Sequence, residues 1–381
     1  MALSARPDGL LKDYFASPAS PPRIVVGLSG GVDSSVAALL LKESGHQVIG
    51  LTLGLSGDPE APAMRHCCSP DTVARAKTVA DHLGIPHYVA DATPQFRRKV
   101  IDYFVDAYAR GFTPNPCIKC NSRVRFSALR DAARRLGADR IATGHYARLD
   151  CGCDGLARAR DRAKDQSYVL AEVPPDLLAD VVFPLGDLTK SEVREIAAQA
   201  GLQKLVAQES QEICFIPDDD YRAFLRSRLG ETPGSIVAPD GRVLGRHSGT
   251  YNYTVGQRRG VPCASGQPLY VLAIDRARNE VVVGPQSAGA VGAMVIEAPI
   301  VHRSLPPGPT HLQFRSLGAP VPALATEDDA FVLLEPALGV ALGQTAVLYS
   351  DDNVVKAGTI ISTRPWSGPA SDGQKPKSPV V

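Results

Sequence analysis

Two cysteines spaced three residues apart stand in a proline-rich stretch, and the second directly precedes an expected helix over residues 121–136. Because the N-terminus of a helix stabilises an anion, we expect the Cys120 thiol to have a pKa below its usual ~8.5 and to act as a sulfur nucleophile. The spacing from Cys117 to Cys120 is also half of a structural zinc site. The other half would have to come from Cys151 and Cys153, or from His66, Cys67 and Cys68.

A short loop rich in glycine and serine lies between an apolar strand and an apolar helix. Its amides and hydroxyls converge on the helix N-terminus, which favours phosphate binding. The loop lacks the lysine of a Walker loop and the GxGxxG spacing of a dinucleotide-binding loop. We therefore expect it to hold a pyrophosphate leaving group, with Asp33 binding Mg²⁺. The loop consists of Gly27, Leu28, Ser29, Gly30, Gly31, Val32, Asp33 and Ser34.

An α/β domain must position these residues, because short apolar runs alternate with helical periodicity from residue 23 to residue 212. Such alternation predicts a parallel sheet with helices on both faces. The expected strands cover residues 24–28, 47–53, 87–91 and 140–147, and the expected helices follow Asp33 and Ser69 and cover residues 94–110 and 121–136.

Beyond residue 212 the sequence changes to short runs separated by turn signals. This pattern of short runs and turns predicts two small, mainly-β domains: a central one over residues 213–290 and a C-terminal barrel over residues 291–362. Residues 1–22 lack the apolar stretch of a signal peptide and are expected to form a flexible tail. Residues 363–381 are rich in Pro, Ser and Lys and are expected to be a disordered tail.

Composition narrows the class of protein and its location. The 381 residues include 41 basic and 40 acidic side chains, and a net charge of +1 argues against binding polyanions through overall charge. No apolar run approaches the ~20 residues of a membrane helix, so we expect a cytoplasmic protein with no membrane partner. Since stable disulfides are rare in that compartment, the eight cysteines favour metal or sulfur chemistry.

Positive charge is concentrated over residues 119–148, where eight basic side chains accompany two aspartates. A solvated helix face would explain this segment, but the adjoining reactive cysteine favours contact with RNA phosphates. Acidic residues gather instead over residues 319–355, which contain no Lys or Arg. The basic side chains are Lys119, Arg123, Arg125, Arg130, Arg134, Arg135, Arg140 and Arg148.

The glycine loop resembles the SGGxDS signature of the PP-loop ATP pyrophosphatase family, whose members use ATP to adenylate an oxygen that nitrogen or sulfur then displaces. Five further blocks, taken together over residues 23–362, resemble the tRNA-specific 2-thiouridylase family, bacterial enzymes that thiolate the wobble uridine. The resemblance implies a parallel-sheet catalytic domain of the adenine nucleotide alpha hydrolase type. The blocks are TPNPxxxCN at 113–121, ATGHYAR at 142–148, KDQSY at 164–168, ICFI at 213–216 and YTxGQRxG at 253–260.

The resemblance also implies roles for single residues. Taken alone, Cys214 lies between apolar neighbours and would be a small buried side chain. The resemblance implies instead that Cys214 carries persulfide sulfur, that Cys120 is the nucleophile, and that the two form a disulfide in alternation. ATP binding is implied for residues 27–34, Leu53 and Gly144, and tRNA binding for Lys164, Asp165, Gln166, Phe314 and Arg315.

Cys117 departs from the family pattern, because many relatives have there an aspartate that is thought to act as an acid/base group. A thiol, with a pKa of ~8.5 against ~4, does not replace a carboxylate in that role. Cys117, Cys120 and Cys214 could instead hold three corners of a 4Fe-4S cluster, as is attributed to a subgroup with this cysteine pattern. Persulfide and cluster mechanisms both remain open. No chemistry is assigned to Cys67, Cys68, Cys151, Cys153 or Cys263.

The resulting hypothesis is ATP-dependent 2-thiolation of the wobble uridine of tRNA. ATP would adenylate the base oxygen, pyrophosphate would leave, and sulfur would then displace AMP. The reaction needs ATP, Mg²⁺, an accessible base in the anticodon loop and an upstream sulfur-donor protein. Two alternatives remain: another PP-loop ligase with a nitrogen nucleophile, or a non-catalytic RNA-binding module that holds ATP or an iron–sulfur cluster.

Overall fold

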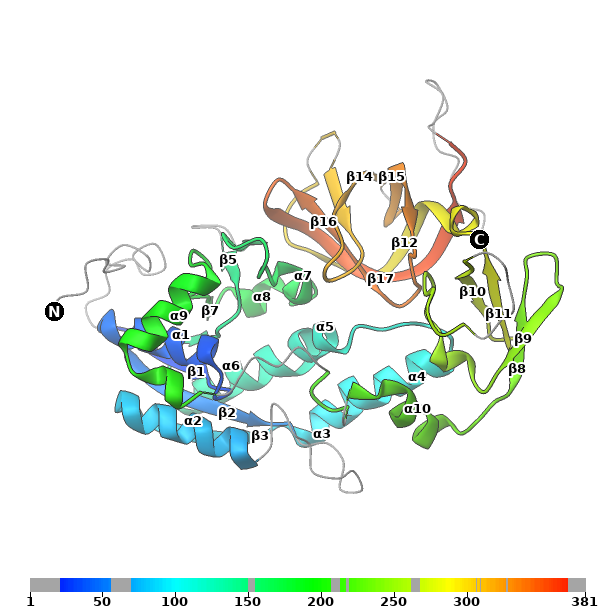
Figure 1. Ribbon diagram of the computed structural model, residues 1–381. Coiled ribbons are helices and arrows are strands. Elements are labelled where there is room, and N and C mark those ends of the chain that lie inside the picture. The colour runs from blue at the N-terminus through cyan, green and yellow to red at the C-terminus, as the bar shows by residue number, and fades with distance from the viewer. Residues whose placement is uncertain are drawn as a thin grey trace.

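The computed structural model describes residues 21–55, 70–149, 155–206, 213–216, 219–261, 268–305, 307–308, 310–326 and 328–368. The N-terminal part is built on a five-stranded sheet in the order β3-β2-β1-β4-β7, in which every neighbouring pair is parallel (Figure 1). Its strands are β1 (Arg23–Gly27), β2 (Gln47–Gly54), β3 (His87–Asp91), β4 (Arg140–Ala142) and β7 (Val181–Val182).

Both faces of this sheet are covered by helices, as the sequence predicts. Val25 points into one core cluster, while its neighbours Ile24 and Val26 point into another. The second cluster includes side chains from α1 (Val32–Glu43), α2 (Pro70–Leu83) and α9 (Lys190–Gln199). The first includes side chains from α4 (Asp102–Ala109) and α6 (Phe126–Arg135). Burial on both faces explains why the strands are almost uninterrupted apolar runs.

The helix that carries the paired cysteines begins earlier than predicted. Helical residues run without a break through α5 (Pro116–Cys120), a π-helical turn (Asn121–Arg125) and α6. Pro116 is the first helical residue, and the side chain of Asn115 accepts the amide hydrogens of Cys117 and Ile118. An asparagine cap followed by proline is a strong start signal. Cys120 therefore lies inside the helix, and the prediction that it lies at the N-terminus was wrong.

Other helices complete the α/β part. The helix expected over residues 94–110 is observed as α3 (Thr93–Phe96), a π-helical turn (Arg97–Ile101) and α4 in succession. One helix, α10 (Tyr221–Leu229), lies in the region expected to be mainly β. The side chain of Asp220 caps it by accepting the amide hydrogen of Ala223, and Leu225 anchors it in the core. The remaining helices are α7 (Ser167–Leu170), α8 (Pro175–Leu178) and α10 (Tyr221–Leu229).

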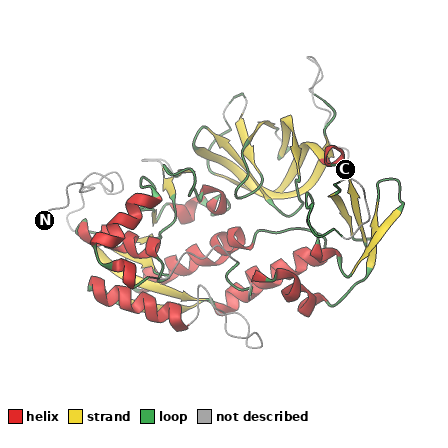
Figure 2. Cartoon of the chain, in the orientation of Figure 1, coloured by secondary structure: helices red, strands yellow, loops and turns green. Residues whose placement is uncertain are grey.

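Two β structures follow, so that most helices lie in the α/β part, around its sheet, and the rest of the chain is built mainly of strands (Figure 2). A small sheet has the order β10-β11-β8-β9. A larger one closes into a six-stranded barrel, because β12 pairs with both β15 and β17. The strands are β8 (Gly234–Val237), β9 (Val243–His247), β10 (Tyr270–Asp275), β11 (Glu280–Gly284), β12 (Ala290–Val301), β13 (Thr310–Gln313), β14 (Val321–Ala325), β15 (Ala330–Leu338), β16 (Thr345–Ser350) and β17 (Asn353–Pro365).

The fold class is thus confirmed: a parallel-sheet α/β part precedes two mainly-β parts. A hairpin of β5 (Ala147–Leu149) and β6 (Leu156–Arg158) joins the α/β part to the barrel, since Ala157 pairs with Asn353 of β17. The predicted domain limits at residues 212, 290 and 362 stay predictions. No helix among the described residues is both long and apolar enough to cross a membrane.

Candidate active site

The glycine loop connects the carboxyl end of β1 to the N-terminus of α1. Ser34 closes it, because its hydroxyl donates to the carbonyl of Gly31 at 3.1 Å and accepts the amide hydrogen of Ser29 at 3.2 Å. Gly30 has a φ of +69° and lies so close to α2 that a Cβ there would be 3.2 Å from two backbone atoms of that helix. The loop is therefore a tight turn held against two helices, with its amides at a helix N-terminus.

Gly144 closes the loop from the neighbouring strand. It follows β4, and a Cβ at this position would lie 2.6 Å from the carbonyl carbon of Asp33 and 2.6 Å from the amide nitrogen of Ser34. Only a glycine allows this close approach of two backbones. Gly144 therefore adjoins the first turn of α1, the part of the chain that the sequence predicts to bind ATP.

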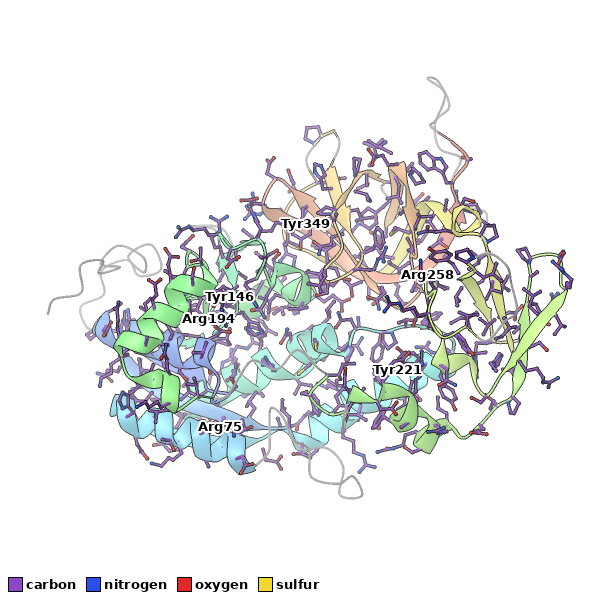
Figure 3. All side chains as sticks on the ribbon, viewed as in Figure 1. Arg75, Tyr146, Arg194, Tyr221, Arg258 and Tyr349 are labelled. Carbon is purple, nitrogen blue, oxygen red and sulfur yellow. The ribbon has the colours of Figure 1, made fainter. Side chains whose placement is uncertain are left out.

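Asp33 is held by two residues that sequence reasoning missed, Lys190 and Tyr146. The ammonium of Lys190 lies 2.7 and 2.9 Å from the two carboxylate oxygens, and the hydroxyl of Tyr146 donates to one of them at 2.8 Å. Lys190 begins α9 and is almost entirely buried, while Asp33 is one-third exposed; Tyr146 lies near α9 in Figure 3. A capping box formed by Thr189 and Glu192 could have located the start of this helix, although not its contact with the loop.

The three candidate cysteines occupy different environments. Cys117, the second residue of α5, is exposed, whereas Cys120 is 5 % exposed at the end of the same helix. Cys214 is half-buried in the short segment 213–216 and packs against the core cluster that contains Cys120. Cys117, rather than Cys120, therefore lies at a helix N-terminus, the position that favours a thiolate.

Metal ligation receives no support from the arrangement of the described residues. Among them, no group of three His, Cys, Asp or Glu side chains is placed so that it could hold a metal ion. The three candidate cysteines are therefore not placed as ligands of one metal ion. The residues that would complete a zinc site lie outside the described residues: His66, Cys67, Cys68, Cys151 and Cys153. Cys263 lies outside them as well.

Two further residues line the inside of the α/β part. Leu53 is 9 % exposed near the carboxyl end of β2, and its register partner on β3 is Ala90. Burial lowers the pKa of His145 to about 3, which keeps its imidazole neutral. The ring nitrogen Nδ1 of His145 lies 2.8 Å from the hydroxyl of Thr143. His145 therefore behaves as a buried neutral side chain next to Gly144.

The segment Lys164, Asp165 and Gln166, predicted to contact tRNA, turns two of its side chains inward. Gln166 accepts the amide hydrogen of Tyr146 at 2.8 Å. Asp165 is 6 % exposed and accepts hydrogen bonds from the backbone of Ala159 and from the hydroxyl of Ser167. Lys164 is partly buried. Gln166 thus holds Tyr146, a partner of Asp33, whereas Asp165 holds the backbone at Ala159.

Phe314 and Arg315 lie on the barrel, away from the glycine loop. Phe314 is 6 % exposed within the barrel core. Arg315 is exposed, covers the ring of Phe314 at 5.3 Å and donates to the carbonyl of Leu338 at 2.6 Å. Arg158 connects the hairpin to this region by donating to Gln313 at 2.9 Å. Only Arg315 of the predicted pair is open to a ligand.

The basic segment over residues 119–148 is less charged toward solvent than its sequence suggests. Lys119 is buried in an ion pair with Glu172. Arg130 pairs with Asp176, and Arg148 pairs with aspartates at positions 187 and 352. The side chains of Arg134 and Arg135 are exposed at the end of α6. Any contact with RNA phosphates in this segment would therefore rest on fewer than the eight basic residues.

Comparison with known proteins adds three matching family profiles. They are the tRNA methyl transferase HUP domain over residues 22–218, the tRNA methyl transferase PRC-barrel domain over residues 222–285 and the aminomethyltransferase beta-barrel domain over residues 294–360. Curated relatives are similar along nearly their whole length. The tRNA-specific 2-thiouridylase MnmA of Kineococcus radiotolerans is 46 % identical over 364 residues, covering 91 % of this chain and 100 % of that protein.

A second relative gives the same result. The tRNA-specific 2-thiouridylase MnmA of Geobacter metallireducens is 46 % identical over 354 residues, covering 89 % of this chain and 96 % of the relative. Among solved structures, a 4-thiouridine synthetase–RNA complex with bound ATP matches 55 % of this chain and 50 % of its own, at 17 % identity and a TM-score of 0.33. We base no conclusion on a structural match this weak.

Proposed function

The chain belongs to the tRNA-specific 2-thiouridylase family, and from this premise we propose how its residues divide the work of ATP-dependent tRNA thiolation. The observation that carries the proposal is the position of Asp33. This residue lies in the glycine loop at the N-terminus of α1, in the α/β part whose core also contains Cys120. The loop activates an oxygen with ATP, and the cysteines deliver sulfur.

ATP binds with its phosphates in the loop over residues 27–34. The amides at the start of α1 stabilise the pyrophosphate that leaves when the base oxygen is adenylated. Lys190 supplies a positive charge beside the same loop, and Leu53 and Gly144 bound the nucleotide site. The carboxylate of Asp33 is the oxygen ligand that Mg²⁺ prefers, and a single carboxylate is a common protein contribution to a magnesium–phosphate site. When bound there, the ion neutralises phosphate charge.

Sulfur transfer proceeds through Cys214 and Cys120. An upstream donor protein leaves a persulfide on Cys214. The terminal sulfur attacks C2 of the adenylated uridine, and the bond from C2 to oxygen breaks as AMP leaves. The Cys120 thiolate then attacks the inner sulfur of Cys214. This breaks the disulfide to the base, leaves 2-thiouridine and forms a Cys120–Cys214 disulfide, which a cellular dithiol reduces. The packing of both cysteines against one core cluster supports this pairing.

A 4Fe-4S cluster is not part of the proposal. The described residues do not bring Cys117, Cys120 and Cys214 into a group able to hold a metal. Cys117 instead stands exposed at the start of α5, which Asn115 caps, and the dipole of a helix stabilises an anion at this end. This thiol faces outward and would meet the incoming base or the donor protein.

The tRNA lies across the exposed ends of α6 and the barrel. Chemistry at C2 of a base needs the nucleotide turned out of its stack, which an anticodon loop allows. Phosphates would be bound by Arg134, Arg135 and Arg315, with Lys164 and Phe314 nearby on their own elements. Gln166 acts indirectly, by holding Tyr146, and Asp165 holds the backbone at Ala159. A cytoplasmic location follows from the need for tRNA and a sulfur donor.

The alternatives are less well supported. A ligase with a nitrogen nucleophile would have no use for a half-buried cysteine packed against the core cluster of a second one. A non-catalytic module would have no use for a loop that brings an aspartate, a lysine and a helix N-terminus together. The methyl transferase wording of two family profiles names a different group transfer from that of the relatives, which are 2-thiouridylases.

The test is formation of 2-thiouridine by the purified full chain, with ATP, tRNA and a persulfide donor, followed by mass spectrometry of the hydrolysed tRNA. We expect Cys120→Ser and Cys214→Ser to abolish the product, and Lys190→Met to lower it by about 100-fold, as loss of one electrostatic contact to a leaving group does. A Cys120→Ser variant that forms the full amount of 2-thiouridine would refute the assignment. Iron and sulfide analysis of anaerobically purified protein tests the cluster: a stoichiometric cluster in active protein would overturn the persulfide scheme.

A further inference from the structure

We propose that the C-terminal barrel positions the cysteine helix, through a buried clamp in which Lys119 and Glu172 join two barrel threonines; this inference rests on the proposed function. Lys119 directly precedes Cys120 in α5, so whatever holds Lys119 sets the position of that thiol. In Figure 1, α5 lies next to β17. The clamp makes the barrel a positioning element for the reaction as well as an RNA-binding surface.

The polar part of the clamp is a closed network. The ammonium of Lys119 donates to the carboxylate of Glu172 and, at 2.8 Å, to the hydroxyl of Thr359 on β17. The other carboxylate oxygen of Glu172 accepts the hydroxyl of Thr345 on β16 at 2.7 Å. The side chains of Lys119 and Glu172 are 3 % and 8 % exposed. Four side chains from four segments of the chain thus pair with one another away from water.

A second contact grips the chain ahead of the cysteines. The amide of Thr113 donates to the carbonyl of Leu342 at 2.8 Å, and the side chain of Gln344 donates to the carbonyl of Thr113 at 2.6 Å. Gly343, with a φ of +87°, lies so close that a Cβ there would be 3.0 Å from the amide nitrogen of Thr113. The barrel loop therefore adds strand-like hydrogen bonds to the segment that leads into α5.

Apolar packing joins the two contacts. Val347 of β16 and Ala357 of β17 belong to the same buried cluster as Ile118 and Cys120. The segment that carries Cys117 and Cys120 is therefore held at Thr113 and at Lys119, and the barrel contributes to both points. A shift of the barrel when it takes up RNA would move this segment with it.

The chemistry of the network favours positioning over stability. Burial lowers the pKa of Lys119, which shows that the ammonium loses hydration at this site. A buried ion pair often contributes no more to stability than apolar side chains of similar size would, but it specifies one arrangement of the groups that form it. Replacing only one partner leaves an uncompensated buried charge, which destabilises the fold. The activity of a single variant therefore cannot separate a misplaced Cys120 from an unfolded chain. The informative variant removes both charges.

The experiment therefore compares Lys119→Met/Glu172→Gln with the wild type and with Lys356→Met. The control variant breaks the ion pair between Lys356 and Asp329, which lies within the barrel. Four quantities are measured on the full chain: the melting temperature, the alkylation rate of Cys120 by peptide mass spectrometry, and kcat and KM for 2-thiouridine formation on tRNA.

We expect the double variant to melt within a few degrees of the wild type, with kcat at least about tenfold lower, because a misplaced reacting group is costly even when it is bound. In the double variant KM for tRNA should be unchanged, and the alkylation rate of Cys120 should change by more than threefold. Lys356→Met should resemble the wild type in kcat and in the alkylation rate of Cys120. The proposal would be overturned if the double variant had the kcat and the Cys120 alkylation rate of the wild type. It would also be overturned if Lys356→Met changed these two quantities as much as the double variant does. If the wild type forms no 2-thiouridine, the proposed function fails, but the alkylation rates still test the clamp.

Discussion

Gly144 offers the sharpest test of the proposed ATP site, through the substitution Gly144→Ala. The added methyl group would lie 2.6 Å from the carbonyl carbon of Asp33, 2.6 Å from the amide nitrogen of Ser34 and 2.9 Å from the carbonyl oxygen of Asp33. All three atoms belong to the backbone of the first turn of α1, so no flexible side chain can move aside. Either α1 or the chain after β4 must shift.

The size of the effect follows from this crowding. One extra carbon in a tightly packed site typically costs about 1–3 kcal/mol. If the shift displaces the amides that bind phosphate, the binding free energy of ATP weakens by a similar amount. The dissociation constant for ATP then rises about 5- to 150-fold. Gly54→Ala is a control on β2, which β1 separates from β4, because the nearest atom to a Cβ there is 3.6 Å away.

The assay is calorimetric titration of ATP into each variant, together with thermal unfolding to show that the chain is folded. We expect Gly144→Ala to bind ATP at least about fivefold more weakly and Gly54→Ala to bind like the wild type. Gly144→Ala that is folded and binds ATP within twofold of the wild type would refute the view that this glycine closes the phosphate loop. An equal loss in Gly54→Ala would show that the effect comes from the sheet.

Two further predictions concern the helix cap and the buried histidine. Asn115→Ala removes the acceptor of the amides of Cys117 and Ile118 and should lower the free energy of unfolding by about 1 kcal/mol. Hydrogen exchange at those two amides should quicken, whereas Asn115→Asp, which also caps, should resemble the wild type; like behaviour of the two variants would contradict the cap. In the folded protein the pKa of His145 is about 3, below its unfolded value of 6.5. The contribution of its neutral ring to the free energy of unfolding is therefore complete above pH 6.5 and is lost as the pH falls toward the folded pKa. Urea unfolding between pH 7.5 and 5.5 measures this effect. Below pH 6.5 the free energy of unfolding of the wild type should fall by about 1.4 kcal/mol per pH unit relative to that of His145→Gln. Equal pH dependence of the two proteins would show that the imidazole is not buried in neutral form.

Local signals predicted the α/β part well. Apolar strands next to glycine and serine placed β1, the loop and α1 in the right order, and the strand over residues 87–91 was predicted with its observed bounds. The start of the cysteine helix was wrong, because Pro116 after Asn115 was taken as part of a connection rather than as a cap. Helix α10 was missed, although Asp220 is a cap residue, because turn signals farther along the chain favoured strands for the whole region.

The sequence by itself determined which chemistry the chain carries, because nucleophile, phosphate loop and cap signals depend on residue type and near spacing. It could not place residues that act across long separations. Lys190 contacts Asp33 from 157 positions away, and Lys119 contacts Thr359 from 240 positions away. Only the folded chain decides such contacts, since burial and pairing of a charge depend on which surfaces meet when the barrel packs on the α/β part. For this reason a lysine that looks like part of a basic surface in the sequence is buried in the structure, beside the thiol that it positions in our proposal.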